Sequence, residues 1–400
     1  MRAITQAYKN AYSGLSPSTW WLSLVMLINR SGTMVLPFMT LYLTRSLHYS
    51  IGRAGIVMSL FGAGSIFGAM IGGKLTDKFG FYYIQMAALL CGGIFFILLG
   101  QMNSYPLICI FVFILSLFND AFRPANSTAI AHYSKPENRT RSYSLNRLAI
   151  NLGWAVGGAM GGFIASRNYH LLFWIDGLTN IFAAILLRAV LAPTRNNATP
   201  KIKDATPKAL TTSPYRDKPY IGFIILTTLF AYTFFQIFST IPVFYVKELH
   251  MSEATIGMVM AINGILIALF EMVTITRLEG RRHNLFYITS GTFVIGLAFI
   301  AFNVLPGMLS LAIIAMLLTT VGEMLSMPFM NAYWIGRSST DNRGRYAALY
   351  SIAWSSAQVL GPGTGAAVAE YAGFRTLWWL IGGICMLTSA GYYLLRRYST

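Results

Sequence analysis

The chain is short of charged residues, and especially of acidic ones. Of its 400 residues, 11% are charged and only 13 are Asp or Glu, whereas charged residues make up about 25% of an average soluble domain. Hydrophobic residues account for 55% of the chain and include 27 Phe, 22 Tyr and 8 Trp. A soluble protein with this composition would lack the polar surface to stay dispersed. The composition therefore indicates a membrane protein.

The sequence also lacks the motifs of a disulfide framework, a metal site or an enzyme. Cys91, Cys109 and Cys385 lie in apolar stretches without C-x-x-C spacing, so we interpret them as small buried residues. There is no P-loop, no H-E-x-x-H and no plausible nucleophile–base set. A membrane-embedded enzyme or receptor is therefore unsupported, and we expect neither a metal nor a cofactor.

What the chain has instead is a series of long apolar stretches. A helix needs about 20 mainly apolar residues to span a bilayer, and twelve stretches are long enough. They lie at residues 18–44, 52–75, 80–102, 106–133, 142–166, 169–191, 219–246, 254–277, 284–304, 308–336, 345–371 and 373–395. This pattern predicts an all-α membrane protein with twelve transmembrane helices.

The basic residues are distributed by topology. The 30 Lys and Arg residues give a formal net charge of +17. With the N-terminus inside, 22 of them lie in cytoplasmic tails and loops, five lie in the opposite loops, and three lie within apolar stretches. This asymmetry follows the positive-inside rule. We expect a multi-pass protein of the cell (inner or plasma) membrane with both termini in the cytoplasm, a lipid bilayer around it and no nucleic-acid partner.

One polar segment divides the chain in two. Five prolines are spread over residues 193–219 among Thr, Asn, Lys and Asp, which prevents a regular helix. We interpret residues 193–218 as a cytoplasmic linker. It joins an N-terminal bundle of six helices, residues 1–192, to a C-terminal bundle of six helices, residues 219–400.

The two halves share a pattern that is displaced by 204 residues. The matching pairs are Pro124 and Pro328, Asn138 and Asn342, Arg139 and Arg343, Arg141 and Arg345, Leu145 and Leu349, Gly157 and Gly361, and Gly161 and Gly365. A duplicated membrane half is typical of a secondary transporter, in which a site between two bundles opens to alternate sides. The repeat therefore predicts two pseudo-symmetric bundles and a small-molecule substrate.

A motif after the second apolar stretch makes this interpretation more specific. Residues 73–80 read G-K-L-T-D-K-F-G, which resembles the G-x-x-x-D-[RK]-x-G motif of the major facilitator superfamily. The resemblance covers the whole chain and implies that family's two-bundle fold. It implies a conformational latch made by Gly73, Asp77, Lys78 and Gly80. Asp77 would pair with a cation or cap a helix N-terminus in one state; the alternative is an ordinary turn with a solvated carboxylate.

A glycine motif follows in the fifth stretch. Residues 153–162 are similar to the g-x-x-x-G-P-x-x-G-G motif of the family's antiporters, with Gly158 in the usual position of proline. By that resemblance the motif favours export, and generic helix packing is the alternative. The glycines that we predict to allow close helix packing are Gly153, Gly157, Gly161, Gly361 and Gly365.

Charges inside the membrane are candidates for function, because an unpaired charge there costs at least about 2.5 kcal/mol. They are Arg30 in the first stretch, Asp120 and Arg123 in the fourth, and Glu323 in the tenth. The first, fourth, seventh and tenth helices line the central cavity of the family that the chain resembles. We therefore predict that these four residues bind substrate or protons, together with Tyr42 and Gln236.

Several of these charges could also pair with one another. Asp120 and Arg123 are three residues apart and share a helix face, and pairing of Arg30 with Asp120 is a second alternative. Glu323 has no cation nearby on its own helix, so it is the best candidate for a protonatable carboxylate.

Two other acids receive no role in transport from the sequence. Glu271, in the eighth stretch, is expected close to the cytoplasm, where Arg277 could pair with it. Asp176, in the sixth stretch, is expected near an edge of the membrane.

The segments around Arg30 and Glu323, with residues 342–346, are similar to those of proton-driven drug and metabolite exporters. A more distant similarity is to proton-coupled peptide transporters, but Met26 and Asn29 replace the glutamates of their E-x-x-E-R-F motif. We expect a monomer that exports a small organic molecule by alternating access and is driven by protons. The alternative is proton-coupled import of a zwitterion such as a peptide or amino acid, with Arg30 holding its carboxylate and Glu323 its ammonium group.

Overall fold

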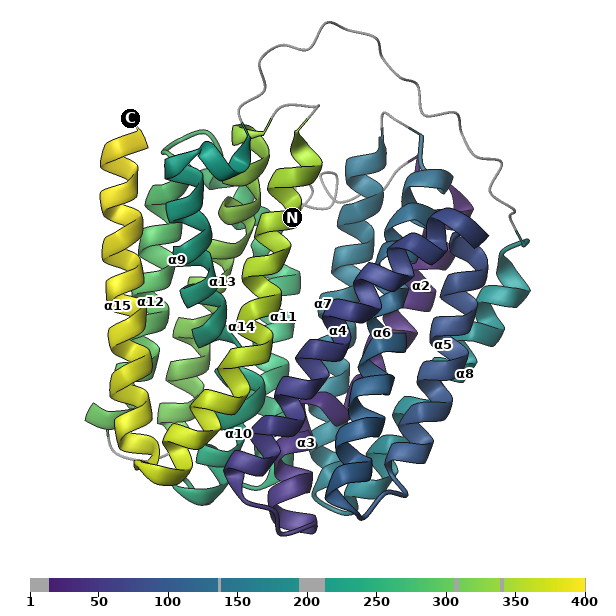
Figure 1. The fold of residues 1–400 in the computed structure, drawn as a ribbon, viewed down its shortest axis with the longest axis horizontal. Coiled ribbons are helices and arrows are strands. Elements are labelled where there is room, and N and C mark those ends of the chain that lie inside the picture. Colours follow the sequence, from purple (N-terminus) through teal and green to yellow (C-terminus); the bar gives the residue numbers. More distant parts are fainter. Residues whose placement is uncertain (1–13, 136–137, 194–212, 306–308, 339–341, 400) are drawn as a thin grey trace, which may run out of the picture. The chain divides into compact units, whose positions relative to one another are not determined.

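The computed structural model describes residues 14–135, 138–193, 213–305, 309–338 and 342–399 (Figure 1). Regular structure in these ranges is helical throughout, without a strand. The chain divides into two compact units. Unit 1 contains Met1–Leu36 and Leu60–Lys201, and unit 2 contains Pro37–Ser59 and Ile202–Thr400. Of the predicted linker, residues 194–212 lie outside the described residues.

Unit 1 is built from five complete helices and most of a sixth. They are α2 (Pro17–Ser31), α5 (Phe81–Leu99), α6 (Tyr105–Tyr133), α7 (Arg139–Ala165), α8 (Tyr169–Val190) and the part of α4 (Ile51–Phe79) that follows Ser59. Within this unit α2 packs against α7 and α8, and α5 packs against α6 and α8.

Unit 2 contains the remaining helices. They are most of α3 (Val35–Leu41), the π-helical turn η1 (Tyr42–Ser46), the start of α4, the 3₁₀ turn η3 (Pro214–Arg216), α9 (Lys218–Phe234), α10 (Gln236–Lys247), α11 (Glu253–Leu278), α12 (Asn284–Val304), α13 (Leu309–Arg337), α14 (Arg343–Tyr371) and α15 (Gly373–Ser399). Here α12 packs against α13 and α15, and α9 packs against α14 and α15.

Eleven spans in the described part of the chain are long and apolar enough to cross a membrane. They confirm the prediction of an all-α membrane protein. The remaining predicted span corresponds to α14, which has 29 residues but is interrupted by Arg345, by serines and by Glu370. Length therefore supports a membrane helix at α14 more strongly than hydropathy does.

The first span of each half is broken into two helices, which the sequence did not predict. In the first half α2 ends at Ser31 and α3 begins at Val35, and in the second half α9 ends at Phe234 and α10 begins at Gln236. The displacement of 204 residues carries Gly32, in the first break, onto Gln236, at the second. The internal repeat therefore extends to the position of the two breaks.

The repeat continues into the loops that follow these spans. The Tyr49 N–H donates to the carbonyl of Leu43 at 2.9 Å, and the Met251 N–H donates to the carbonyl of Tyr245 at 3.0 Å. One residue before each donor lies a histidine in the left-handed backbone region, His48 with φ 56° and His250 with φ 51°. A left-handed residue other than glycine is uncommon, so its presence at both places is a structural mark of the duplication.

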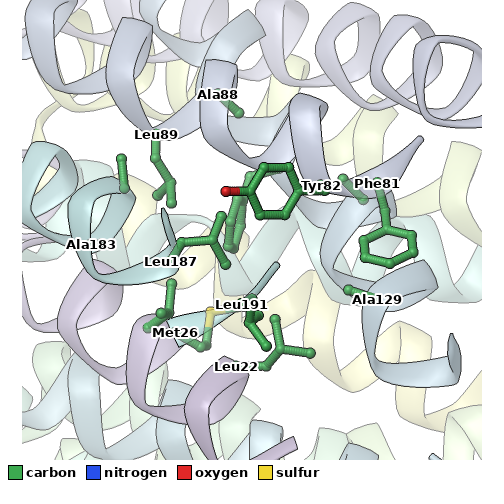
Figure 2. Close-up of a cluster of buried hydrophobic side chains, with 14 of the residues drawn as sticks. Leu22, Met26, Phe81, Tyr82, Ala88, Leu89, Ala129, Ala183, Leu187 and Leu191 are labelled. Atoms are coloured by element: carbon green, nitrogen blue, oxygen red, sulfur yellow. The ribbon is translucent and has the colours of Figure 1, made fainter. Parts of the chain in front are cut away.

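The core of unit 1 lies where α2, α5, α6 and α8 meet (Figure 2). Figure 2 shows Leu22 and Met26 of α2 near Leu187 and Leu191, with Tyr82 and Leu89 of α5 across from them. These side chains are 5% exposed or less. Inside a lipid bilayer the gain from this contact is mainly close packing, because lipid tails are as apolar as the side chains.

A polar cluster joins three helix ends of unit 2. Asp217, the N-cap of α9, accepts two hydrogen bonds from the Arg337 guanidinium, at 2.7 and 2.8 Å. It also accepts the Tyr346 hydroxyl at 2.9 Å and the Tyr220 N–H at 3.2 Å. Burial alone would raise the pKa of the Asp217 carboxyl, but these hydrogen bonds outweigh it and hold the pKa below its ordinary value.

We expect Asp217→Asn to lower the melting temperature of the purified protein by several degrees at neutral pH. The reason is that hydrogen bonds to a charged group contribute about 1.5–3 kcal/mol each. Because the folded-state pKa is lowered, the contribution of Asp217 is complete above its unfolded pKa of about 3.9 and is lost as the pH falls through the lower folded value.

Thermal unfolding of wild type and Asp217→Asn over a series of pH values measures this. The gap between them should narrow below about pH 4. The exposed Glu279 provides the control Glu279→Gln, which should melt like wild type. A gap that stayed constant with pH would contradict a role for the ionised Asp217 carboxylate.

Candidate functional site

Unit 1 brings three of the predicted site residues together. Asp120 on α6 forms an ion pair with Arg123 at 2.7 Å. The Asp120 side chain is 3% exposed, whereas the Arg123 side chain is 63% exposed. Arg30 lies at the end of α2, is 9% exposed and interacts electrostatically with both residues. One buried carboxylate thus interacts electrostatically with two guanidinium groups.

The guanidinium group of Arg30 is not fully satisfied within the described part of the chain. Its Nε is buried and has no hydrogen-bond acceptor there. A buried donor without an acceptor costs about 1–3 kcal/mol. An incoming oxyanion could therefore gain a strong, charge-assisted hydrogen bond at this position.

The glycines of α7 determine how closely α2 approaches. A Cβ atom at Gly153 would lie 2.5 Å from the Cβ of Arg30, and one at Gly157 would lie 3.1 Å from the carbonyl oxygen of Ser31. Gly161 is buried one turn further along α7. Larger residues at Gly153 would displace Arg30, so this part of the motif positions the arginine.

Glu323 lies in unit 2, on α13, and is 6% exposed. The side-chain amide of Asn263, on α11, lies 3.4 Å from its Oε2 and 3.0 Å from the Thr320 hydroxyl. Glu271, also on α11, is 6% exposed and close enough to Glu323 for the two carboxylates to repel one another. The structure therefore buries Glu271 within unit 2, about two helical turns from Asn263 along α11, and its pairing with Arg277 stays a prediction.

Gln236 and Tyr42 are both buried in unit 2, at 0% and 1% exposure. The Gln236 amide donates to the carbonyl groups of Tyr232 (3.2 Å) and Gly361 (3.0 Å). Its oxygen accepts the Thr240 hydroxyl at 2.8 Å. These bonds give Gln236 a structural role at the break between α9 and α10, and substrate binding by Gln236 stays a prediction.

The glycines of α14 make room for this amide. A Cβ atom at Gly365 would lie 2.2 Å from the Gln236 side-chain oxygen, and one at Gly361 would lie 3.2 Å from the carbonyl oxygen of Tyr232. The paired motifs of α7 and α14 thus occupy equivalent places, each against the broken first span of its own half.

The predicted latch residues lie at the end of α4 and the turn that follows it. Asp77 is exposed on the last turn of α4, and the Lys78 ammonium lies 5.1 Å from the centre of the Phe79 ring. Gly80 has φ +91°, a conformation that side chains rarely adopt, and this allows the sharp turn into α5. Gly73 lies one turn before Asp77, and a Cβ atom there would just touch Pro124.

Sequence reasoning missed the polar residues around the first break. Asp176 on α8 is fully buried and binds backbone N–H groups at the start of α3. Asn29 of α2 donates to Asn180 of α8 at 2.8 Å. The signal that singled out Glu323 was also present at Asp176, since both are acids in an apolar stretch without a cation nearby on the same helix.

Comparison with known proteins gives the family of the chain. The sequence profile of the Major Facilitator Superfamily matches residues 21–334 and 224–400. The MFS-type transporter YdeE of Escherichia coli (strain K12) is 24% identical over 346 residues, which are 84% of each chain. A Na⁺, Li⁺, K⁺/H⁺ antiporter of Planococcus maritimus is 22% identical over 397 residues, covering 91% of this chain and 92% of the antiporter.

A solved structure shows the same fold. The crystal structure of a POT peptide transporter in complex with sulfate superposes with a TM-score of 0.80, covering 97% of this chain and 96% of the other at 16% identity. This supports the fold alone. The family and the fold predicted from the sequence are confirmed: the chain belongs to the Major Facilitator Superfamily and is a multi-pass membrane transporter with twelve helices in two six-helix bundles.

Proposed function

We propose that the chain is a proton-coupled exporter of a small organic molecule, with Glu323 as the group that carries the proton. The observation behind this is a carboxyl group buried within unit 2, with an amide as its described hydrogen-bond partner. Burying a carboxylate without a cation costs far more than burying the neutral acid. A proton is therefore the ligand that this position favours.

Glu271 supports the same role. Two ionised carboxylates repel one another in a membrane, and a proton on Glu323 relieves the electrostatic repulsion between it and Glu271 on α11. Exchange of that proton for substrate would couple the movement of the proton across the membrane to the movement of the substrate. The energy source is then the proton gradient, with no cofactor required.

In unit 1 the proposal gives the three charged residues the task of holding the substrate. Protonation of Asp120 would remove the partner of Arg123, and a substrate anion would take its place. The direction of transport rests on the antiporter motif of α7 and on the antiporter among the relatives. The excess of Lys and Arg on one side supports cytoplasmic termini, and we propose the cell (inner or plasma) membrane as the location and a monomer as the active form.

The alternative is proton-coupled import of a zwitterion. Arg30 Nε, which has no acceptor among the described residues, would bind its carboxylate, and Glu323 would bind its ammonium group. An untargeted metabolite comparison between cells with and without the transporter separates the two. Accumulation of a metabolite in cells that lack it supports export, and depletion supports import.

The relative from Planococcus maritimus raises one further candidate substrate class, alkali cations. Vesicles that contain the protein and a pH-sensitive dye test this directly. Dissipation of the pH gradient on addition of Na⁺, Li⁺ or K⁺ would show that the chain exchanges cations for protons, and would contradict the proposal of an organic substrate. No dissipation is expected under the proposal.

We expect Glu323→Gln to reduce proton-driven transport about tenfold or more, because the amide cannot carry a proton. Exchange of substrate without a gradient should be largely preserved. The measurement is transport of the identified metabolite into or out of proteoliposomes, with and without a pH gradient. Glu248→Gln, at an exposed acid of the same unit, is the control. Wild-type gradient-driven rates in Glu323→Gln would rule out this role for Glu323.

We expect Asp120→Asn to impair transport more than the surface change Glu248→Gln, because it leaves Arg123 without its buried partner. Arg30→Ala should weaken the binding of an anionic or zwitterionic substrate about tenfold, the value of one hydrogen bond to a charged group. The substrate affinity of Arg30→Lys, which keeps the charge, should lie between the affinities of wild type and Arg30→Ala. Substrate binding to the purified protein measures these effects, and unchanged affinity in Arg30→Ala would assign that residue to structure alone.

We propose that the exposed Asp77 is part of a latch that holds the cytoplasmic ends of the two bundles in one state. Asp77→Asn would remove an interaction of about 1 kcal/mol and change the ratio of two states about fivefold. Spin-label distances between the cytoplasmic ends of α4 and α14 should lengthen in this variant. Glu279→Gln, in the equivalent loop of the second half, should leave them unchanged. Identical distributions in Asp77→Asn and wild type would reduce residues 73–80 to an ordinary turn.

A further inference from the structure

Unit 2 contains a pocket that the proposed function does not use. It lies where η3, the start of α9 and the end of α13 meet, and its lining residues are Arg216, Asp217, Lys218, Pro219 and Arg337. Its volume is about 350 Å³, whereas pockets for small ligands measure about 300–1,000 Å³. The pocket is therefore large enough for a small polar group.

The acid in this pocket has no acceptor capacity left. A carboxylate offers about four lone-pair positions. Asp217 accepts two hydrogen bonds from the Arg337 guanidinium. The Tyr346 hydroxyl and the Tyr220 N–H donate two more. Asp217 therefore cannot serve a further cation.

Arg216 and Lys218 are the remaining cations of the pocket. Both are exposed, and neither forms an ion pair with an acid in the described ranges. The pocket thus has three basic residues and one acid, and the excess positive charge lies on Arg216 and Lys218. An anion is the ligand that this balance of charge favours.

The start of α9 contributes less than these side chains. A helix N-terminus carries a partial positive charge and free N–H groups. Here the Tyr220 N–H is bound by the Asp217 side chain, and the Ile221 N–H is bound by the Asp217 carbonyl. Pro219 has no N–H. An anion in the pocket would therefore be held mainly by side-chain charges.

Positive charge continues from the pocket toward α12 and α15. Burial lowers the pKa of His283, the N-cap of α12, and the charges of Arg396 and Arg337 lower this pKa further. The guanidinium groups of Arg282 and Arg396 lie 4.6 and 5.5 Å from the centre of the Phe286 ring. The positive potential at this end of unit 2 thus extends over several helix ends, which raises the local concentration of anions.

The pocket also lies at the boundary of two membrane spans. The span Lys218–Lys247 begins, and the span Leu309–Arg337 ends, with a residue that lines it. Tyr215, next to Arg216, is 66% exposed, and tyrosine is enriched at the level of lipid headgroups. The proposed topology puts this end at the cytoplasmic leaflet, which carries anionic lipids.

The cations of the pocket have no counterparts in the first half. The displacement of 204 residues carries Lys218 onto Gly14 and Arg337 onto Tyr133. The positive-inside rule accounts for basic residues near the ends of spans, but it does not require that they line a pocket around a saturated acid. The arrangement is therefore specific to the second half.

We propose that the pocket of residues 216–219 and Arg337 binds a phosphate group, with Arg216 and Lys218 as its charged donors. Phosphate oxygens accept strong hydrogen bonds from both types of side chain, and the charge of the phosphate offsets the excess charge of the pocket. The headgroup of an anionic phospholipid fits the location, and a water-soluble phosphate compound offers the same chemistry. The site is independent of the transported substrate and of the proton.

Binding to the full-length protein, delipidated and purified in a neutral detergent, tests this site. The probes are dioctanoyl phosphatidylglycerol and the water-soluble sn-glycerol 3-phosphate. We expect Arg216→Gln combined with Lys218→Gln to weaken binding about thirtyfold, because each basic residue near an anionic headgroup contributes a factor of about five. Lys247→Gln combined with Arg375→Gln removes two exposed cations elsewhere in unit 2 and should bind like wild type.

The two probes also identify the source of the phosphate. Tighter binding of phosphatidylglycerol assigns the site to a lipid, and equal or tighter binding of glycerol phosphate assigns it to a soluble compound. In both cases the variant without Arg216 and Lys218 must lose affinity. Wild-type affinity in that variant, or binding of neither probe to wild type, would overturn the proposal.

Asp217→Asn separates phosphate binding from stability. It removes the negative charge of the pocket and weakens the hold on the Arg337 guanidinium. We expect this variant to bind the preferred probe about fivefold more tightly than wild type, although it should melt at a lower temperature. The affinity is measured well below that melting temperature, where weaker binding than in wild type would contradict the proposal.

Discussion

A lipid bilayer offers no hydrogen-bond partners, and this constraint explains the polar residues of the spans. A continuous helix meets it internally, but each half of this protein breaks its first span. At the first break Asp176 accepts the freed N–H groups, and at the second the amide of Gln236 bridges α9 and α14. The surrounding lipid therefore explains three features together: the two breaks, the buried polar residues beside them and the glycines that face them.

Close approach of helices is the second requirement of that arrangement. Gly153 admits α2 to the surface of α7 at Arg30, and Gly365 admits the Gln236 side chain to α14. In unit 2, Gly55 of α4 meets Ala366 of α14 so closely that a Cβ atom would lie 2.4 Å from the alanine Cβ. Small residues thus occur where a broken span or its continuation packs against another helix, as expected where van der Waals contact drives association.

The buried charges differ between the two units. In unit 1, Arg30 and Arg123 both interact with one carboxylate, Asp120, whereas in unit 2 Glu323 lies beside the Asn263 amide and is repelled by a second buried acid, Glu271. The two halves therefore keep one backbone plan but carry different chemistry. An anion suits the first arrangement and a proton or cation suits the second. This difference is the basis for our proposal that unit 1 mainly binds substrate and unit 2 carries the proton.

The sequence by itself determined the spans, the duplication and the family, and it offered the pairing of Asp120 with Arg123 as one of two alternatives, because helix length and i, i+3 spacing are local properties of the chain. The tertiary structure decided what faces each helix. It brought Asp176 to the start of α3, occupied the Gln236 amide with intramolecular bonds and buried Glu271. Such contacts depend on the crossing angles and axial rotations of helices that are far apart in the sequence. The 3.6-residue period of a helix determines neither.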